Sequence, residues 1–183
     1  MNICAIDPSW TETGIAFTRV KHVHPEMDGP ISFVTVMGQR VGSDDERRDD
    51  TVNRIARFCE IFDVLLVEEP ITHGRQQIGK SNQLFGALMY ALKHSGMLDR
   101  DVVRVNPTHV KKIAVGKGRG SKHAVLAAAI KRLNFPGHNE HQADARWMLE
   151  MALHHYKHDL RTRLPQSHLE FLDRTRWPCQ ATT

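Results

Sequence analysis

The sequence predicts an α/β fold in which a mixed β-sheet is packed between helices. Two observations lead to this prediction: three short apolar strands follow one another within residues 2–38, and helical and strand patterns alternate from residue 44 onward. Strands joined by short connections pair antiparallel, whereas strands separated by helices pair parallel. With 183 residues, the chain is long enough to form one domain with a full hydrophobic core.

The first three strands are recognised by their apolar patterns and by the turn between the first two. Residues 2–7 ("NICAID") form a short apolar run, and residues 14–20 ("GIAFTRV") alternate apolar and polar side chains. The intervening "PSWTET" is rich in turn-forming residues, so we expect a hairpin. The β-branched run at 31–38 ("ISFVTVMG") is the third strand.

The later elements alternate between helix and strand. A helix is expected over residues 44–62, because its apolar side chains recur at helical spacing and its acidic first turn favours the helix dipole. The next elements are a strand, a helix, a strand and two helices, at residues 63–69, 81–94, 101–105, 121–133 and 140–156. The segment after residue 160 is predicted to be weakly structured, with a short helix near Leu169.

The composition, with 40% hydrophobic and 25% charged residues, is that of an ordinary soluble globular protein. No apolar run approaches the roughly 20 residues of a membrane span, and the N-terminus lacks the pattern of a signal peptide. Cys4, Cys59 and Cys179 are far apart, which argues against a disulfide framework or a thiolate zinc site. We therefore expect a cytoplasmic protein, from a bacterium or from a virus in its host; the sequence does not separate these origins.

The net charge of +4 is unevenly distributed. Residues 102–139 contain no Asp or Glu but eight basic residues, Arg104, Lys111, Lys112, Lys117, Arg119, Lys122, Lys131 and Arg132. Such a block forms either a solvated surface or a surface for a phosphate backbone.

Carboxylates stand at the ends of two predicted core strands. Asp7 ends the first strand, and Glu68 and Glu69 end the fourth. Ligands of open α/β sheets bind beyond the carboxyl ends of the strands, so these side chains are expected to point into one crevice. Converging carboxylates repel one another unless a cation lies between them or their pKa values rise.

A third acidic position opens the helix predicted at 140–156. His141 and Asp144 are three residues apart and therefore lie on one helix face. Glu140, His141 and Asp144 are also residue types that the dipole favours at a helix start, so this position alone has two interpretations. Together with Asp7 and Glu68, however, it forms a set suited to Mg²⁺ or Mn²⁺. Two such ions, ~3.5–4 Å apart, promote phosphodiester hydrolysis, which predicts a metal-dependent nuclease.

Four stretches, taken together and in this order, resemble the RuvC-type Holliday-junction resolvases, which belong to the RNase H-like (retroviral-integrase) superfamily. They are "AIDPSWTETGIAF", "LLVEEP", "HVKKIAVGKGRGSKHAV" and "HQADARWMLEMAL". The resemblance implies an RNase H-like mixed five-stranded sheet with helices on both faces in residues 1–160. It leaves residues 161–183 as a C-terminal extension that could bind DNA or complete a dimer.

Carried over residue by residue, the resemblance implies that Asp7, Glu68, His141 and Asp144 are the catalytic residues and the ligands of two Mg²⁺ or Mn²⁺ ions. Glu68 is preferred to Glu69 because the catalytic Glu of the family directly follows the apolar run. Strand alternation also sends the two glutamates to opposite faces. Additional ligands or supporting residues are expected at Glu69 and Glu140.

The resemblance further implies a substrate of branched DNA. The predicted contacts form a basic loop at 111–122, with Lys111, Lys112, Lys117, Arg119 and Lys122. Family members often carry an aromatic residue shortly after the catalytic Glu, where it stacks at the junction centre. Ile71 stands nearest to that place here. Either Ile71 acts as an apolar wedge, or the junction is opened differently, or branch recognition is looser.

The family acts as a homodimer that nicks two strands symmetrically, and the helix predicted at 81–94 resembles its dimerisation element. Apolar side chains run nearly all round this helix, which fits either a dimer contact or a fully buried core helix. No helicase partner can be identified from the sequence.

Three other functional classes compete with the resolvase interpretation. An actin- or sugar-kinase-like protein needs small residues in the loop after the first strand, but Ser9 and Trp10 stand there. A non-catalytic branched-DNA-binding module and a superfamily nuclease acting on RNA or replication forks remain open. A zinc site at His154 and His158, which have chelating spacing, lacks a third ligand.

Overall fold

The computed structural model of the chain describes residues 1–20, 30–70, 78–95, 102–156 and 164–170, together with 172, 175 and 177. The strands are β1 (Asn2–Asp7), β2 (Glu12–Arg19), β3 (Ser32–Met37), β4 (Val64–Glu68) and β5 (Val102–Val105). The helices are α1 (Asp44–Cys59), α2 (Ile78–His94), α3 (Pro107–Val115), α4 (Lys122–Leu133), α5 (Glu140–His155) and α6 (Gln166–Leu169).

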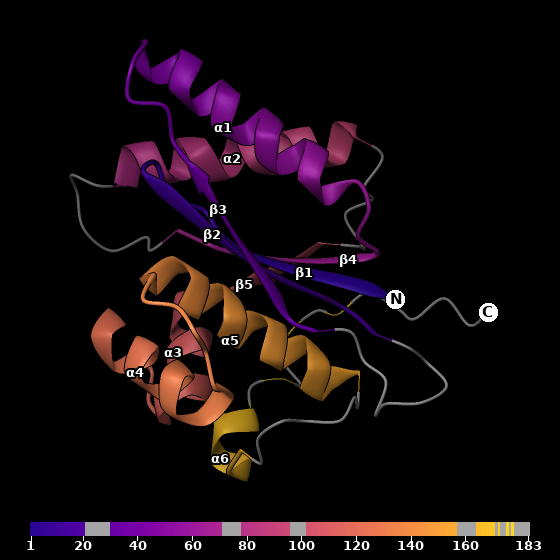
Figure 1. Cartoon of the computed structure of the whole chain (residues 1–183), viewed down its shortest axis with the longest axis vertical. Helices are drawn as coiled ribbons and strands as arrows, with labels where there is room; N and C mark the ends of the chain where they lie inside the picture. The colour runs from indigo at the N-terminus through magenta and orange to yellow at the C-terminus, as the bar shows by residue number, and fades with distance from the viewer. Residues whose placement is uncertain are drawn as a thin grey trace.

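The five strands form one mixed sheet in the order β3-β2-β1-β4-β5 (Figure 1). β1 pairs antiparallel with β2, and β2 pairs antiparallel with β3. β4 lies parallel to β1 on one side and to β5 on the other. The predicted mixed sheet is therefore confirmed, and the carboxyl ends of β1, β4 and β5 meet at one edge.

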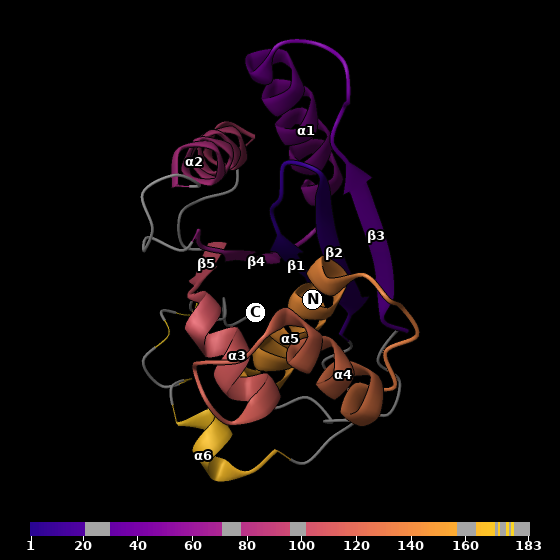
Figure 2. The same ribbon diagram turned by 90° about the vertical axis from the view of Figure 1, so that its left-hand side faces the viewer.

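Helices cover both faces of the sheet, as predicted. α1 and α2 lie on one face, and α3, α4 and α5 lie on the other (Figures 1 and 2). Each central strand is buried on both sides, so its apolar residues alternate between two cores. In β1, for example, Ile3 and Ala5 pack on the α5 side, while Cys4 and Ile6 pack against the side of α1 and α2.

α3 was not predicted as a helix. The basic loop expected at 111–122 begins instead as helical structure, and Lys111 and Lys112 lie on α3. The local signals for this helix are present: the Asn106 side chain accepts a hydrogen bond from the backbone N–H of Thr108, and Gly116 ends the helix with a φ of 78°. Only three of its nine residues are buried, and this pattern is too short for a periodicity argument.

Part of the C-terminal segment packs on the α5 side of the sheet. The predicted short helix is present as α6, and Leu172 is buried in the same core as α5. Trp177 stacks on His155 with ring centroids 4.3 Å apart. Among the described residues, no helix combines the length and the apolar character that crossing a bilayer requires.

Candidate metal centre

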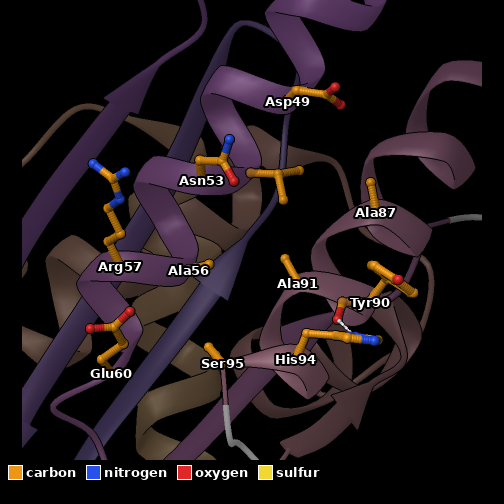
Figure 3. A pocket seen from close by; sticks show the side chains of 11 residues that line it. Asp49, Asn53, Ala56, Arg57, Glu60, Ala87, Tyr90, Ala91, His94 and Ser95 are labelled. Carbon is orange, nitrogen blue, oxygen red and sulfur yellow. Dashed lines mark hydrogen bonds between the residues drawn. The ribbon is translucent and has the colours of Figure 1, made fainter.

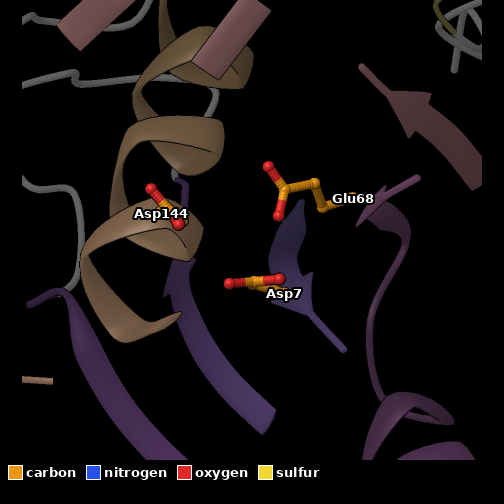
Figure 4. A group of neighbouring side chains, drawn as sticks. All are labelled: Asp7, Glu68 and Asp144. Atoms are coloured by element: carbon orange, nitrogen blue, oxygen red, sulfur yellow. The ribbon is translucent and has the colours of Figure 1, made fainter. Parts of the chain in front are cut away.

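Three carboxylates from three different elements converge at one edge of the sheet. Asp7 ends β1, Glu68 ends β4 and Asp144 lies near the start of α5 (Figure 4). Each offers one oxygen, and the three oxygens lie within 4.8 Å of one another. Two strand-end carboxylates and one helix carboxylate are thus brought together, as the sequence analysis expected of their positions.

Strand alternation explains why these oxygens meet. Asp7 follows Ala5 by two positions and Glu68 follows Leu66 by two positions, and both Ala5 and Leu66 face the core on the α5 side. Because β1 and β4 are parallel neighbours, their last side chains on this face lie close together. Glu69 is one residue further along, and its backbone N–H extends the sheet by donating to the carbonyl of Val105 over 2.8 Å.

Gly14 allows α5 to come close enough to deliver Asp144. It pairs with Asp7 across β1 and β2. A Cβ atom at Gly14 would lie 2.2 Å from the carbonyl carbon of His141 and 2.3 Å from the backbone nitrogen of Gln142. These are backbone atoms that no side-chain rotation can move away, so only glycine fits under the first turn of α5.

Glu68 and Asp144 are held in an environment that opposes their ionisation. Asp7 and Asp144 are only 4% and 6% exposed. The pKa of Asp144 is raised to about 7, mainly because the side chain is buried and secondly because Asp7 is negatively charged. The pKa of Glu68 is raised well above its usual range, mainly by the loss of hydration and secondly by the negative charge of Asp7. A divalent cation would remove this repulsion, and a set of carboxylate oxygens without thiolates fits Mg²⁺ or Mn²⁺.

His141 lies beside this group and contacts it through one member. Its Nδ1 atom is 2.6 Å from Oδ2 of Asp7. Nδ1 is therefore engaged in a short hydrogen bond with Asp7, and Nε2 is the ring nitrogen outside this bond; the tautomer decides which of the two nitrogens carries the proton. Of the four predicted ligands, Asp7, Glu68 and Asp144 bring their oxygens within 4.8 Å of one another, and His141 contacts this group through Asp7.

Lys122 lies inside the site, although the sequence analysis placed it only among the DNA contacts. Its Nζ is 4.0 Å from Oδ2 of Asp7, 3.9 Å from Oδ2 of Asp144 and 3.4 Å from Nδ1 of His141. Its positive charge opposes the rise in the pKa of Glu68 and Asp144. Lys122 thus partly compensates the negative charge of the carboxylates.

The other predicted residues lie around this centre rather than in it. Glu140 forms an ion pair with His123 of α4, with 3.4 Å between Oε1 and Nδ1. Lys111 is near enough to lower the pKa of Asp144. Lys117 and Arg119 lie in the connection between α3 and α4. Ile71, His158 and the four arginines of the C-terminal extension, Arg161, Arg163, Arg174 and Arg176, lie outside the described residues.

A separate groove of about 540 Å³ lies between α1 and α2, on the other face of the sheet (Figure 3). Ala56, Ala87 and Ala91 line its apolar part, and Tyr90 stacks on His94 at its rim. The groove includes none of the carboxylates of the candidate metal centre.

No protein-family model matches the chain, and no curated protein matches it significantly. Solved structures do match. A Thermus thermophilus RuvC structure is 18% identical, with a TM-score of 0.62 over 90% of this chain and 100% of that chain. T. thermophilus RuvC in complex with a Holliday junction substrate is 20% identical, with a TM-score of 0.65 over 90% of this chain and 99% of that chain.

At this identity the similarity concerns the fold. It extends over nearly the whole of both chains, as the resemblance in the sequence implied. The predicted RNase H-like arrangement of five strands and flanking helices is confirmed. The chain therefore has the fold of the RuvC resolvases.

Proposed function

We propose that the protein is a metal-dependent endonuclease that resolves Holliday junctions by symmetric nicking, in recombination and repair or in phage DNA processing. The observation that carries this proposal is the convergence of Asp7, Glu68 and Asp144 within 4.8 Å at the sheet edge. The fold shared with a RuvC structure that holds a Holliday junction supports the choice of branched DNA as the substrate.

Each residue of the site has a distinct role in this proposal. Asp7 would serve as a ligand to both metal ions, while Glu68 and Asp144 would each complete the ligand set of one ion. Two bound Mg²⁺ or Mn²⁺ ions would supply an activated water and stabilise the departing oxygen. His141, hydrogen-bonded to Asp7 through Nδ1, would act as the general base that takes a proton from the attacking water.

Positive charge next to the carboxylates is proposed to hold the DNA backbone. Lys122 stands in the site, and Lys111 and Lys112 lie on α3, which precedes the loop carrying Lys117 and Arg119. Contacts to phosphates give affinity without sequence preference, which suits an enzyme that recognises a branch. We keep Ile71 as the candidate wedge at the junction centre.

A homodimer would supply the two active sites that symmetric nicking needs. α2 is buried on one side only: Leu84, Leu88 and Leu92 are buried, whereas Gly86 and Tyr90 are exposed. This exposure excludes the alternative of a helix buried on all sides. The exposed side of α2, with Tyr90 66% exposed, is the proposed dimer contact.

We assign the catalytic domain to residues 1–160 and the extension to 161–183, in a protein that acts in the cytoplasm. Two alternatives have the same fold: a related nuclease acting on other branched DNA or on RNA, and a branched-DNA-binding module without catalysis. Burying three mutually repelling carboxylates costs folding energy, and a binding module has no use for them.

The variants Asp7→Asn and Glu68→Gln test the assignment of the site. Each removes one ligand charge while keeping the shape of the side chain, so we expect cleavage to fall by at least roughly 10²–10³-fold. Junction binding, measured by gel shift in EDTA, is expected to persist. Asp45→Asn, at an exposed position of α1, is the matched control and is expected to cleave normally. Normal cleavage by both site variants would show that the assignment is wrong.

A further inference from the structure

The first turn of α5 rests on a row of three residues that runs across the antiparallel part of the sheet. Asp7 of β1 pairs with Gly14 of β2, and Gly14 pairs with Thr35 of β3. Side chains of directly paired residues lie on the same face, which here is the face that α5 covers. Two consecutive residues of α5 contact the two ends of this row: Nδ1 of His141 is 2.6 Å from Asp7, and Nε2 of Gln142 donates to the Thr35 hydroxyl over 2.8 Å.

A second attachment lies just before the helix and involves Asn139. Its side-chain oxygen caps α5 by accepting from the backbone N–H of Gln142 over 3.0 Å. Its side-chain NH₂ donates to Oε2 of Glu12, at the start of β2, over 2.8 Å. The amide is therefore oriented from both ends, because its oxygen must face the helix and its nitrogen must face the carboxylate.

These attachments bear directly on the candidate metal centre. Asp144 follows Gln142 by two residues, so any shift of the first turn moves its carboxylate relative to Asp7 and Glu68. A metal ligand must be held within a fraction of an ångström by the residues around it. Neither Glu12 nor Asn139 belongs to the carboxylate group itself.

We propose that Glu12 and Asn139 are positioning residues whose hydrogen bond sets the place of Asp144, and with it the affinity of the site for divalent cations. Gln142 and Thr35 support the same turn from its other side. The inference rests on the proposed function, since it assumes that the three carboxylates bind metal. Glu12 and Asn139 are 127 positions apart in the sequence, so their hydrogen bond exists only in the folded protein.

Exchanging the two polar partners tests the proposal. Asn139→Asp keeps a good helix cap but sets two carboxylates against each other, so we expect Mn²⁺ binding to weaken by about 10- to 100-fold. In the double variant with Glu12→Gln, the amide at position 12 donates to the carboxylate at position 139. The hydrogen bond is therefore restored in the reverse direction, and the net charge is that of the wild type. The double variant is expected to return to within about threefold of wild-type affinity, because the partners again complement each other.

The measurement is titration calorimetry of the DNA-free protein with Mn²⁺. Glu12→Gln alone keeps an oxygen that accepts from Asn139 but loses the charge of Glu12, so it is expected to weaken Mn²⁺ binding less than Asn139→Asp does. Glu170→Gln, at an exposed position after α6, controls for the loss of a carboxylate elsewhere. Unchanged binding in Asn139→Asp, or failure of the double variant to recover, overturns the proposal.

Additional experiments distinguish a failure of this inference from a folding defect and from a failure of the proposed function. Thermal unfolding of each variant checks the fold. If Asn139→Asp does not fold, Thr35→Val, which loses only the bond to Gln142, replaces it and must weaken Mn²⁺ binding. Junction binding in EDTA is expected to stay unchanged in all variants. If the variants change Mn²⁺ affinity as expected but the wild type does not cleave the junction, only the proposed substrate is wrong. A wild-type protein that binds no Mn²⁺ overturns both the proposed function and this inference.

Discussion

Asp144 is a buried acid that the fold keeps partly protonated near neutral pH. Burial and the charge of Asp7 raise its pKa to about 7, whereas an unfolded Asp titrates near ~3.9. Between these values the folded state binds more protons than the unfolded state. Its stability therefore decreases as pH rises through this window, and the loss is complete above the folded pKa.

The decrease of stability with rising pH gives a prediction for the metal-free protein. In EDTA, we expect the free energy of unfolding to fall by a few kcal/mol between about pH 5 and about pH 8. Asp144→Asn removes the titrating group and is expected to flatten this fall, while Asp45→Asn keeps it. Urea unfolding at several pH values measures the effect. Parallel pH curves for wild type and Asp144→Asn would contradict the electrostatic description of the site.

At the scale of single residues, the candidate ligands could be predicted from the sequence, but their surroundings could not. Asp7 and Glu68 were recognisable because each follows a buried strand, where a charge is out of place without a function. Lys122 was recognisable only as part of a basic block. Its place among the carboxylates depends on how α4 packs beside α5, and no local pattern records that packing.

At the scale of elements, the contact between β2 and α5 leaves no room for a side chain at Gly14. Gly14→Ala brings a Cβ atom within 2.2 Å of the α5 backbone, so the helix has to move. We expect a destabilisation of roughly 1–3 kcal/mol and a loss of cleavage, because Asp144 moves with the helix. Thermal unfolding and cleavage assays measure both effects.

Gly79→Ala is the matched control for this substitution, since nothing lies within 4 Å of the added atom. It is expected to leave stability unchanged or slightly increased. Full activity and stability in Gly14→Ala would show that α5 does not rest on β2 as described.

The basic connection between α3 and α4 gives a second prediction at this scale. Replacing Lys117 and Arg119 together by Ala is expected to reduce the slope of log affinity against log salt by about 2, because each phosphate contact contributes about 0.9. Arg19→Ala is the control, since Arg19 is exposed at the end of β2 and pairs with Asn2, at the end of the sheet opposite the carboxylates. Junction binding at several salt concentrations measures the slope, and equal slopes in all three proteins would exclude this loop from the DNA contact.

The elements themselves were largely predictable, and the exception has a physical reason. The strands and the longer helices repeat their apolar pattern often enough to be recognised, and their order determined the mixed sheet. α3 was missed because nine residues with three buried positions show no clear period. The attachment of Asn139 to Glu12 could not be predicted, because a hydrogen bond between residues 127 positions apart leaves no local pattern.

At the scale of the whole molecule, the two faces of the sheet have separate uses in the proposed enzyme. The carboxylates, α5 and the basic helices form the α5 side, where DNA is cut. α1 and α2 cover the other face, and the exposed side of α2 is free, within the described part of the chain, to contact a second copy. In the proposed homodimer, each subunit would contribute one metal centre.

The most direct test of this account is the cleavage of a labelled four-way junction beside linear duplex, with EDTA, Mg²⁺ or Mn²⁺ present. The account predicts paired symmetrical nicks that require a divalent metal and spare the duplex. Tight junction binding without any cutting would contradict the catalytic assignment. Equal cutting of flaps, forks and RNA hybrids would preserve the metal centre and contradict the assignment as a resolvase.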